Sequence, residues 1–443
     1  MDNSSKAAAA TAEYDRLIAR HHAMRLRRQL LTPASPSEAS SGAAPGSAGP
    51  GSGGHDDYDG AGDQHLVRRD LDLVAPLPEL IDHLYAVMFR RRPYLRALFP
   101  ASMEFQQSHL ERVLQHLVDH LHRPAELARM LRRLGRDHRK LGVRPVHYEA
   151  FEEALCAAIR HRAGEHWTEG LEAAWLRMLR FAVGAMVAGA ESAVTEPPYW
   201  HAVVTGHERR RPDLAVLRVR TGEPYPYRAG QYGTVEHPVL PHTWRQYSMG
   251  CAPRGDNELE FHVRRVGPGG VSAALVGHTA VGDRLRLGPP RGGLLPDGDG
   301  YGDGDGYGDG DGYGDGDGYD RDPARDLLLV AGGTGLAPMK AIVEQQALHR
   351  PPGRRVHLFV GARDRTDLYD WQALTELGLH KPWLALTPVT SGRLADTVAA
   401  AGDWREHLAC VSGPAGMVAS VRTELLAAGL PLARVRYDQV LSR

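Results

Sequence analysis

The pattern of apolar and polar positions divides the chain into a helical part and two later parts rich in strands. Between 70 and 194, apolar residues recur at helical spacing, as in Leu110, Val113, Leu114 and Leu117, which predicts an all-helical domain. From about 198 the pattern changes to short alternating runs separated by turn residues, which predicts a small antiparallel β-barrel. These runs are 202–204, 214–219, 231–235, 258–263 and 284–287.

Three apolar runs near the C-terminus, with helical stretches between them, predict a parallel sheet covered by helices. They are 327–331, 356–360 and 408–412. The expected fold is therefore multidomain, with an all-α domain over 70–194, an antiparallel β-barrel over 198–296 and an α/β parallel-sheet domain over 323–443. A chain of 443 residues is long enough for about three such domains.

Two segments of biased composition fall outside these domains. Residues 1–69 combine a basic, helix-prone arm with a Ser/Gly/Ala/Pro tract, and we expect disorder in the tract because it offers little apolar surface to bury. The arm is interpreted as an additional helix of the helical domain, a segment that binds a protein partner, or a solvated extension. Residues 297–322 repeat Asp-Gly-Asp-Gly-Tyr-Gly, and this period does not match calcium-binding β-rolls, so we expect a flexible acidic insertion.

Composition limits the expected partners and compartment. The net charge of -1 gives no reason to expect nucleic acid or an anionic membrane as a partner. Cys156, Cys251 and Cys410 are far apart and match no zinc or disulfide spacing, which suits a reducing cytoplasm. The sequence has no uninterrupted apolar run of about 18 residues and no signal-peptide core. We therefore expect a soluble cytoplasmic protein.

Three motifs follow one another across the predicted barrel. A flavin dinucleotide needs a cation at its pyrophosphate, an aromatic ring against the isoalloxazine, and hydroxyl and backbone N–H groups at the ring edge. Arg245 and Tyr247 match the first two needs, and Ser248 is expected near the flavin N5. Each motif alone is weak, but the three in order predict an FAD site. They are Tyr227-Arg-Ala-Gly-Gln-Tyr232, Arg245-Gln246-Tyr247-Ser248 and Gly269-Gly270-Val271-Ser272, the last expected to open a helix at a phosphate.

Next comes an apolar strand that runs into a glycine turn and a helix. This local geometry places helix N-terminal N–H groups at a dinucleotide pyrophosphate. Its position after the flavin motifs favours a site for NADH or NADPH over a plain tight connection. Arg363 and Arg365 leave the choice of nucleotide open, with a slight preference for accepting both. The turn and first helical residues are Gly332, Gly333, Thr334, Gly335, Leu336, Ala337 and Pro338.

In this order the motifs resemble the ferredoxin reductase family, whose further landmarks are present as Val360-Gly-Ala-Arg363 and Val411-Ser412-Gly413-Pro414. The resemblance implies that Ser412, Gly413 and Pro414 lie at the nicotinamide. The family usually has a cysteine at the position of Ser412, so we expect hydride transfer that is slower but retained. It also has an aromatic ring over the flavin near the position of Val440, so we expect nicotinamide access to be less gated.

The helical part resembles the globin domain of the flavohaemoglobins. The resemblance rests on Leu84-Tyr85-Ala-Val-Met-Phe89, Leu98-Phe99-Pro100, the pair Gln106 and Leu110, and the string from Leu134 to Tyr148 that contains His138. It implies that Tyr85 hydrogen bonds bound oxygen, that Phe99 packs on the haem, and that Gln106 and Leu110 form the distal helix pair. His138 would be the proximal iron ligand, oriented through Tyr148 and Glu191. A lone helical histidine is more often an ordinary surface residue, and the context favours a ligand.

One departure from that family concerns the link between its haem and flavin domains. The family often pairs a lysine just before the proximal histidine with a glutamate near the C-terminus. This chain has Asp137 and Asp438 at those places, so the same ion pair cannot form. Arg136 or Arg139 is expected to provide a substitute.

The resemblance covers 70–443 apart from the repeat, and it implies haem b, FAD and NADH or NADPH as cofactors. It implies an NAD(P)H-dependent nitric oxide dioxygenase whose small-molecule partners are O2, nitric oxide and the nicotinamide. Two alternatives remain open. One is a haem-based gas or redox sensor whose N-terminal arm binds a protein partner, and the other is a flavin reductase whose globin fold holds no haem.

Overall fold

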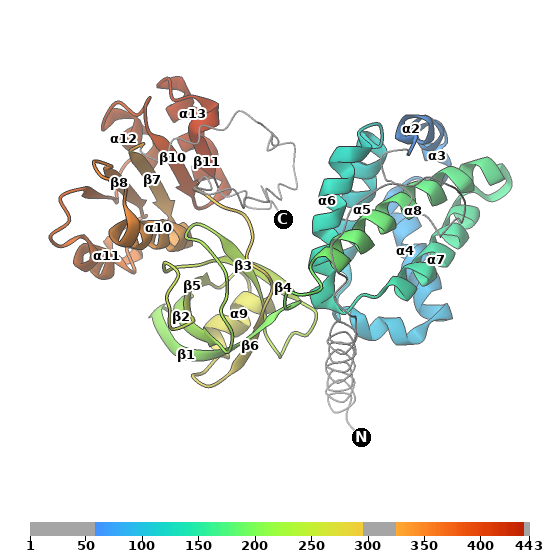
Figure 1. Ribbon diagram of the computed structural model, residues 1–443, viewed down its shortest axis with the longest axis horizontal. Coiled ribbons are helices and arrows are strands. Elements are labelled where there is room, and N and C mark those ends of the chain that lie inside the picture. The colour runs from blue at the N-terminus through green and yellow to red at the C-terminus, as the bar shows by residue number, and fades with distance from the viewer. Residues whose placement is uncertain (1–57, 296–324, 438–443) are drawn as a thin grey trace, which may run out of the picture. The chain divides into compact units, whose positions relative to one another are not determined.

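The computed structural model describes residues 58–295 and 325–437. The expected arm up to residue 57, the repeat 297–322, Asp438 and Val440 lie outside these ranges. Along the described chain, helices come first, then an antiparallel sheet, then a parallel sheet (Figure 1). This order confirms the predicted fold class.

The described chain divides into two compact units, and the first is entirely helical. It contains α2, α3 and α4, most of α5 and α7, and the first part of α8. Its core is a set of fully buried apolar side chains that recur at helical spacing, including Leu80, Leu84, Leu155, Ile159 and Trp175. The helices are α2 (Gly60–Arg69), α3 (Leu71–Val74), α4 (Leu77–Arg91), α5 (Glu104–His120), α7 (Pro145–Ala163) and α8 (Glu169–Ser192).

Helix α2 corrects the expected start of the helical domain at residue 70. It begins at Gly60, inside the segment for which we expected an arm and a disordered tract. Val67 is fully buried, and the Gln64 side chain donates hydrogen bonds to the carbonyl oxygens of Val118 (2.8 Å) and Asp119 (2.7 Å). These tertiary contacts hold a helix that its glycine-rich beginning does not favour.

Helix α8 is, among the described helices, the one long and apolar enough to cross a membrane, and half of that stretch is buried. In the second unit its C-terminal part packs closely on α6 (Pro124–His138). A Cβ at Gly189 would lie 2.0 Å from the Arg132 carbonyl oxygen, and one at Gly135 would lie 1.9 Å from that of Met186. Such close backbone contact is typical of a helix in the core of a helical fold.

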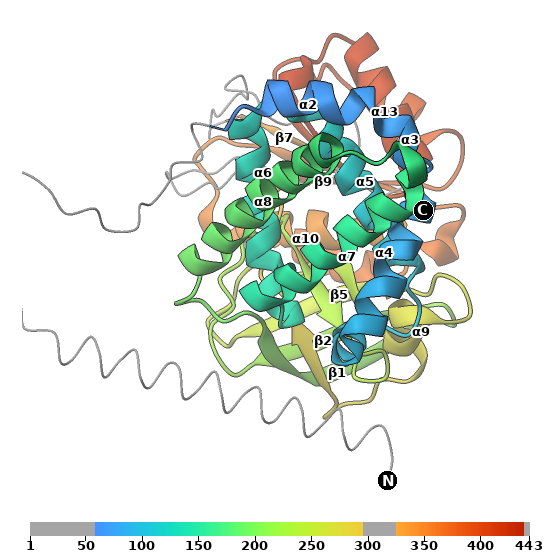
Figure 2. The same cartoon turned by 90° about the vertical axis from the view of Figure 1, so that its right-hand side faces the viewer.

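Six strands form the antiparallel sheet of the second unit, in the order β4-β3-β6-β1-β2-β5. Alternating apolar side chains such as Leu217, Phe261 and Leu287 form its core. Helix α9 (Gly270–Gly277) packs against β2, β4 and β5, as both views show (Figures 1 and 2). All five alternating runs predicted as strands are strands. The strands are β1 (Trp200–Arg211), β2 (Leu214–Thr221), β3 (Tyr232–Glu236), β4 (Trp244–Ser248), β5 (Glu258–Arg264) and β6 (Arg284–Leu287).

The parallel sheet has the order β11-β10-β7-β8-β9 and confirms the three predicted apolar strands. Two edge strands were not predicted, because β9 is only partly buried and contains a proline, and β11 has three residues. The strands are β7 (Leu327–Gly332), β8 (Val356–Gly361), β9 (Leu384–Val389), β10 (Leu408–Ser412) and β11 (Val435–Tyr437). The helices are α10 (Leu336–His349), α11 (Trp371–Gly378), α12 (Leu394–Ala400) and α13 (Ala415–Ala427).

Candidate functional site

Three aromatic rings, one of them that of Tyr85, form a cluster in the helical unit. Tyr85 and Phe89 lie on α4, and Phe99 follows the short 3-10 helix Pro93–Leu98. The Tyr85 ring meets the Phe99 ring edge-on, with 5.6 Å between ring centroids, and Phe89 contacts both. Burial raises the pKa of Tyr85 to about 12. Its hydroxyl is therefore neutral at pH 7 and can donate a hydrogen bond to a ligand.

Gln106 and Leu110 lie one turn apart on α5, as the sequence predicted. Both side chains are partly buried. The Gln106 Oε1 atom is buried and has no hydrogen-bond partner within the described part of the chain. A buried polar atom without a partner is costly, which is consistent with a site that a bound group completes.

His138 is the last residue of α6, and its own helix fixes its tautomer. Nδ1 lies 2.8 Å from the Leu134 carbonyl oxygen, which can only accept, so Nδ1 carries the proton. The lone pair of the neutral ring is then on Nε2, the form that coordinates a metal. Tyr148 lies in the first turn of α7, and burial raises its pKa to about 12; Glu191 is exposed near the end of α8. In the described ranges, no hydrogen bond joins either of these side chains to His138.

Asp137 binds two cations of its own. The expected pairing of Arg136 or Arg139 with the acid near the C-terminus stays a prediction, since Asp438 lies outside the described residues; both arginines bind Glu196. Asp137 Oδ1 accepts from Lys140 Nζ at 2.7 Å and from Arg291 Nη2 at 2.9 Å. Asp137, the acid next to His138, therefore binds two cationic side chains.

Lys140 continues this cluster to the barrel strand β3. Its ammonium is almost fully buried and donates to the Thr234 hydroxyl at 3.0 Å. It also lies 5.2 Å from the centre of the Trp244 ring at the start of β4. Burial alone would raise the pKa of the Asp137 carboxyl, but Lys140 and Arg291 outweigh it and hold that pKa well below its usual range. The end of α6 is therefore tied to the strand pair that carries the flavin motif.

The predicted flavin motif lies on β4, which pairs with β3 so that Tyr232 stands opposite Ser248. Tyr247 packs against the barrel core, and burial raises the pKa of its hydroxyl. Arg245 and Gln246 are exposed, and the Arg245 guanidinium lies 4.9 Å from the centre of the Phe105 ring. The strand thus presents an exposed cation and a half-buried ring two residues apart, on one face.

A second predicted phosphate contact lies at the start of α9. Gly269 precedes the helix and Gly270 has a positive φ of 85°. A Cβ at either glycine would meet nothing within 4 Å, so the backbone is open to a ligand. Val271 is buried in the barrel core, and the Ser272 hydroxyl accepts from the Val266 N–H at 3.1 Å. This bond closes the loop before the helix.

The glycine turn after β7 has the predicted strand–turn–helix geometry. Gly333 has a positive φ of 56° and open space around it, and α10 begins at Leu336, earlier than expected. A Cβ at Gly335 would lie 2.2 Å from the Ser412 carbonyl oxygen, so only glycine allows the turn to contact β10. Thr334 lies between these glycines, Gly332 ends β7, and Ala337 and Pro338 are buried in the first turn of α10.

The C-terminal end of β10 lies beside this turn. Ser412 is 3% exposed, and Gly413 and Pro414 lead from it into α13. Cys410, two residues earlier, is fully buried, and its thiol donates to the Leu294 carbonyl oxygen at 3.2 Å. A pocket next to the turn is lined by residues including Gly333, Gly361 and Trp371. The sequence motifs from β7 and β10 therefore meet at one edge of the sheet.

Three family models match the chain in succession. The globin family matches residues 82–186, the oxidoreductase FAD-binding domain 201–294 and the oxidoreductase NAD-binding domain 329–423. A flavohemoprotein of Vibrio cholerae is 24% identical over 82% of this chain and 92% of its own, and one of Bordetella pertussis is 29% identical over 64% and 70%. The chain is therefore similar to the flavohaemoglobins in its succession of globin, FAD-binding and NAD-binding domains. A flavohemoglobin structure from Malassezia yamatoensis, with bound FAD and heme, shares the fold at TM-score 0.65 and 18% identity, covering 85% of this chain and 98% of that one.

Other relatives are reductase components of oxygenase systems. The reductase subunit of an aromatic O-demethylase from Amycolatopsis is 36% identical over 38% of this chain and 44% of its own length. The naphthalene 1,2-dioxygenase reductase component of Pseudomonas putida is 30% identical over 44% and 56%. The chain therefore spans about half the length of these relatives.

The residues of this chain fit the cofactors that the matching domain families imply. The open backbone at Gly269, Gly270 and Gly333 leaves room where phosphates would meet helix N-termini. In the second unit, the tautomer of His138 fits a haem ligand. In the first unit, the buried oxygen of Gln106 fits a site that a bound group completes. The haem, FAD and nicotinamide predicted from the sequence are thus confirmed as cofactors of the family. The role of each individual residue is a proposal.

Sequence reasoning missed the buried ion pairs of this chain. Lys140 and Lys340 contact partners 94 and 80 residues away, so no local motif reveals them. A signal was nevertheless present in the composition, because the chain has 49 arginines and only 4 lysines. Two of those lysines are buried.

Proposed function

We propose that this chain acts as a flavohaemoglobin, passing electrons from NADH or NADPH through FAD to haem and oxidising nitric oxide to nitrate with O2. The observation that carries the proposal is His138, because a histidine with its proton held on Nδ1 distinguishes this chain from a plain flavin reductase. The succession of globin, FAD-binding and NAD-binding domains supports the electron path. Nitric oxide as the substrate is supported by the family alone.

The cofactors supply the redox chemistry: bound FAD accepts a hydride and can release single electrons, and ferrous haem binds O2. The chain supplies the rest. We assign the nicotinamide pyrophosphate to the turn Gly333–Gly335, the flavin to Arg245, Tyr247 and Ser248, and the iron to Nε2 of His138. In the same proposal Tyr85 donates its hydroxyl proton toward the bound gas, because its raised pKa keeps it neutral.

The remaining assignments are parts of the same proposal. Phe99, Gln106 and Leu110 would line the gas side of the haem, and Tyr148 and Glu191 would act on the histidine side. The three cysteines are free thiols, which supports the reducing cytoplasm as the compartment.

Nitric oxide consumption by the purified holoprotein tests this function. With NADH and O2 present, we expect nitric oxide to disappear and nitrate to form in equal amounts. His138→Ala should lose both the Soret band and this activity, while NADH still reduces the flavin. A wild-type protein that binds haem and FAD but forms no nitrate would contradict the proposal.

A further inference from the structure

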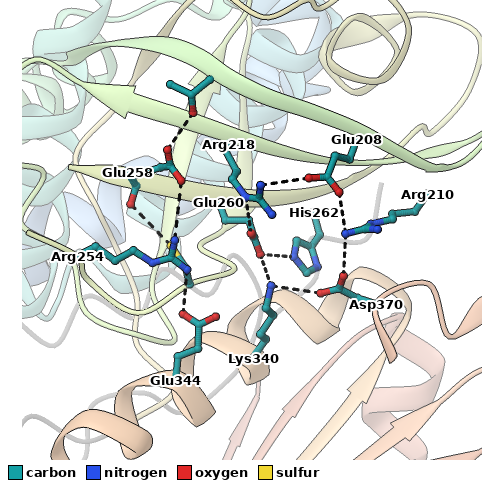
Figure 3. Close-up of polar contacts among 12 residues, drawn as sticks. Glu208, Arg210, Arg218, Arg254, Glu258, Glu260, His262, Lys340, Glu344 and Asp370 are labelled. Atoms are coloured by element: carbon teal, nitrogen blue, oxygen red, sulfur yellow. Dashed lines mark hydrogen bonds and ion pairs between the residues drawn. The ribbon is translucent and has the colours of Figure 1, made fainter. Parts of the chain in front are cut away.

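A buried cluster of charged side chains joins the flavin barrel to the first helix of the nicotinamide-binding sheet (Figure 3). Its centre is the ammonium of Lys340 on α10, which lies 2.5 Å from Glu260 Oε1 and 3.3 Å from Asp370 Oδ2. Glu260 is on β5, and Asp370 immediately precedes α11. All three residues are at most 8% exposed.

The side chains around Lys340 are arranged as the ligands of a metal ion would be, but the lysine takes the place of the ion. Glu260, His262 and Asp370 offer ligand atoms that all lie within 4.8 Å of one another. The Lys340 ammonium contacts both carboxylates and so provides the positive charge that an ion would otherwise bring. This protein carries its own cation at that point.

His262 completes the cluster through both of its ring nitrogens. Its Nε2 lies 3.0 Å from Glu260 Oε1 and its Nδ1 lies 2.7 Å from the Tyr369 hydroxyl. A ring with its proton on Nε2 donates to the carboxylate and accepts from the phenol, so both nitrogens are satisfied. Burial is the largest cause that raises the pKa of Tyr369, which keeps that phenol a donor.

Two arginines extend the cluster beyond Lys340. Arg218 pairs with Glu260 at 3.4 Å, and Arg210 pairs with Asp370 at 3.5 Å. Both arginines also bind Glu208, at 3.2 Å and 2.9 Å. The three acids of β1, β5 and the loop before α11 thus meet three cations, and Lys340 is the one supplied by α10 (Figure 3).

The cluster lies next to both proposed binding segments. A Cβ at Gly250, two residues after Ser248, would lie 2.9 Å from His262 Nε2, and the Gly250 N–H donates to the Glu260 carbonyl oxygen at 2.7 Å. On the other side, β5 contacts α10 and the turn Gly333–Gly335. The same few side chains therefore connect the end of the flavin motif to the nicotinamide turn.

We propose that Lys340 is a positioning residue that holds α10 on β5 and so sets the distance between the nicotinamide and the flavin. The proposal rests on the reductase function proposed above. Buried ion pairs give geometric specificity more than net stability. Hydride transfer is sensitive to that geometry, since a misplacement of about 1 Å costs on the order of 100-fold in rate.

The test compares Lys340→Met with Lys340→Met/Glu260→Gln in the full-length holoprotein. The single variant removes the central cation, and the double variant restores charge balance without restoring the link. Lys381→Met, which changes a partly exposed lysine after α11, is the matched control. Stopped-flow flavin reduction at saturating NADH, the dissociation constant of NADH, and hydrogen exchange of the α10 amides are measured for each.

We expect Lys340→Met to slow flavin reduction by about 10-fold or more, with less than about a 3-fold change in the NADH dissociation constant. Exchange of α10 should accelerate about 10-fold or more while that of α13 is unchanged. The double variant should regain the wild-type unfolding temperature and keep the slow reduction. Lys381→Met should match the wild type in all three measurements.

Recovery of the wild-type reduction rate in the double variant would overturn the proposal, because charge balance alone would then suffice. Wild-type exchange and reduction in Lys340→Met would overturn it as well. The exchange measurement needs no NADH. If the wild-type flavin were not reduced by NADH, the reductase function would fail, and hydrogen exchange of α10 would still decide whether Lys340 holds the helix.

Discussion

Lys140 and Lys340 have nearly the same burial and opposite surroundings. They are 7% and 8% exposed, and each ammonium contacts a strand of the barrel. At Lys140 a single carboxylate, Asp137, serves two cations, since Arg291 binds it too. At Lys340 a single ammonium serves two carboxylates.

The pKa values of the two lysines follow this inversion. Burial lowers the pKa of Lys140, and Asp137 only partly offsets it while Arg291 adds to the lowering. Burial would also lower the pKa of Lys340, but Glu260 and Asp370 outweigh it and the pKa is raised. In each cluster one side chain is shared by two groups of opposite charge, and we call it the minority partner. It is Lys340 in one cluster and Asp137 in the other. We expect each cluster to depend most on this shared side chain.

The largest effect on stability is expected for Lys340→Met, which leaves two buried carboxylates without their shared cation. Removing one member of a buried ion pair typically costs about 3–5 kcal/mol. We expect the free energy of local opening of α10, measured by hydrogen exchange, to fall by about that amount. A fall below about 1 kcal/mol would contradict the role of a minority partner.

Asp137→Asn is expected to have the second largest effect, because Lys140 and Arg291 would then lose the carboxylate that they share. The Asp137 side chain is 27% exposed, so solvent screens part of the loss and about 2 kcal/mol is expected. Hydrogen exchange at the C-terminal end of α6 measures it. Asp403→Asn is the matched control, since the carboxyl of Asp403 pairs with Arg405 and is 62% exposed.

Lowering the pH should reduce the difference in free energy of unfolding between the wild type and Lys340→Met. Burial alone would raise the pKa of Glu260, but His262 and Lys340 outweigh it and hold that pKa well below its usual 4.5. A carboxyl with a lowered folded pKa contributes stability that is present above its unfolded pKa and lost as the pH falls through the folded value. In the variant the carboxyl lacks Lys340 and is protonated at a higher pH. The difference in free energy of unfolding should therefore decrease below neutral pH, by at most about 1.4 kcal/mol per pH unit for one proton. Denaturant titrations at several pH values measure this difference. An increase at lower pH would contradict the prediction.

The smallest effect is expected for Lys140→Met. Asp137 then still has Arg291 at 2.9 Å, whereas in Lys340→Met the two carboxylates keep arginine partners only at longer distances, Arg218 at 3.4 Å from Glu260 and Arg210 at 3.5 Å from Asp370. We expect the opening free energy at the end of α6 to fall by about 1 kcal/mol, the usual worth of one lost hydrogen bond. If this variant were as unstable as Lys340→Met, the distinction between majority and minority partners would be wrong.

The sequence predicted what depends on periodicity and on local backbone geometry. The alternating runs of the barrel and the apolar runs of the parallel sheet are strands because each pattern buries one face or both. The glycine turn after β7 could be predicted because Gly335 has to lie against the Ser412 carbonyl oxygen, a need that appears in the sequence as glycine.

What could not be predicted depends on contacts between distant residues. Helix α2 begins with Gly60-Ala61-Gly62, a weak helix start, and is held by contacts of Gln64 with residues more than fifty positions away. The contacts of Arg136 and Arg139 with Glu196, and of Asp137 with Arg291, join residues far apart in the chain. The order of charged residues along the chain does not show which of them will pair.

Anaerobic mixing of the purified holoprotein with NADH tests the central claim most directly. Electrons that pass from the nicotinamide through the flavin to iron bound at His138 must first bleach the oxidised flavin and then produce the ferrous haem spectrum. We predict both changes in this order, and loss of the second alone in His138→Ala. A flavin that is reduced while bound haem remains ferric would contradict the proposed electron path.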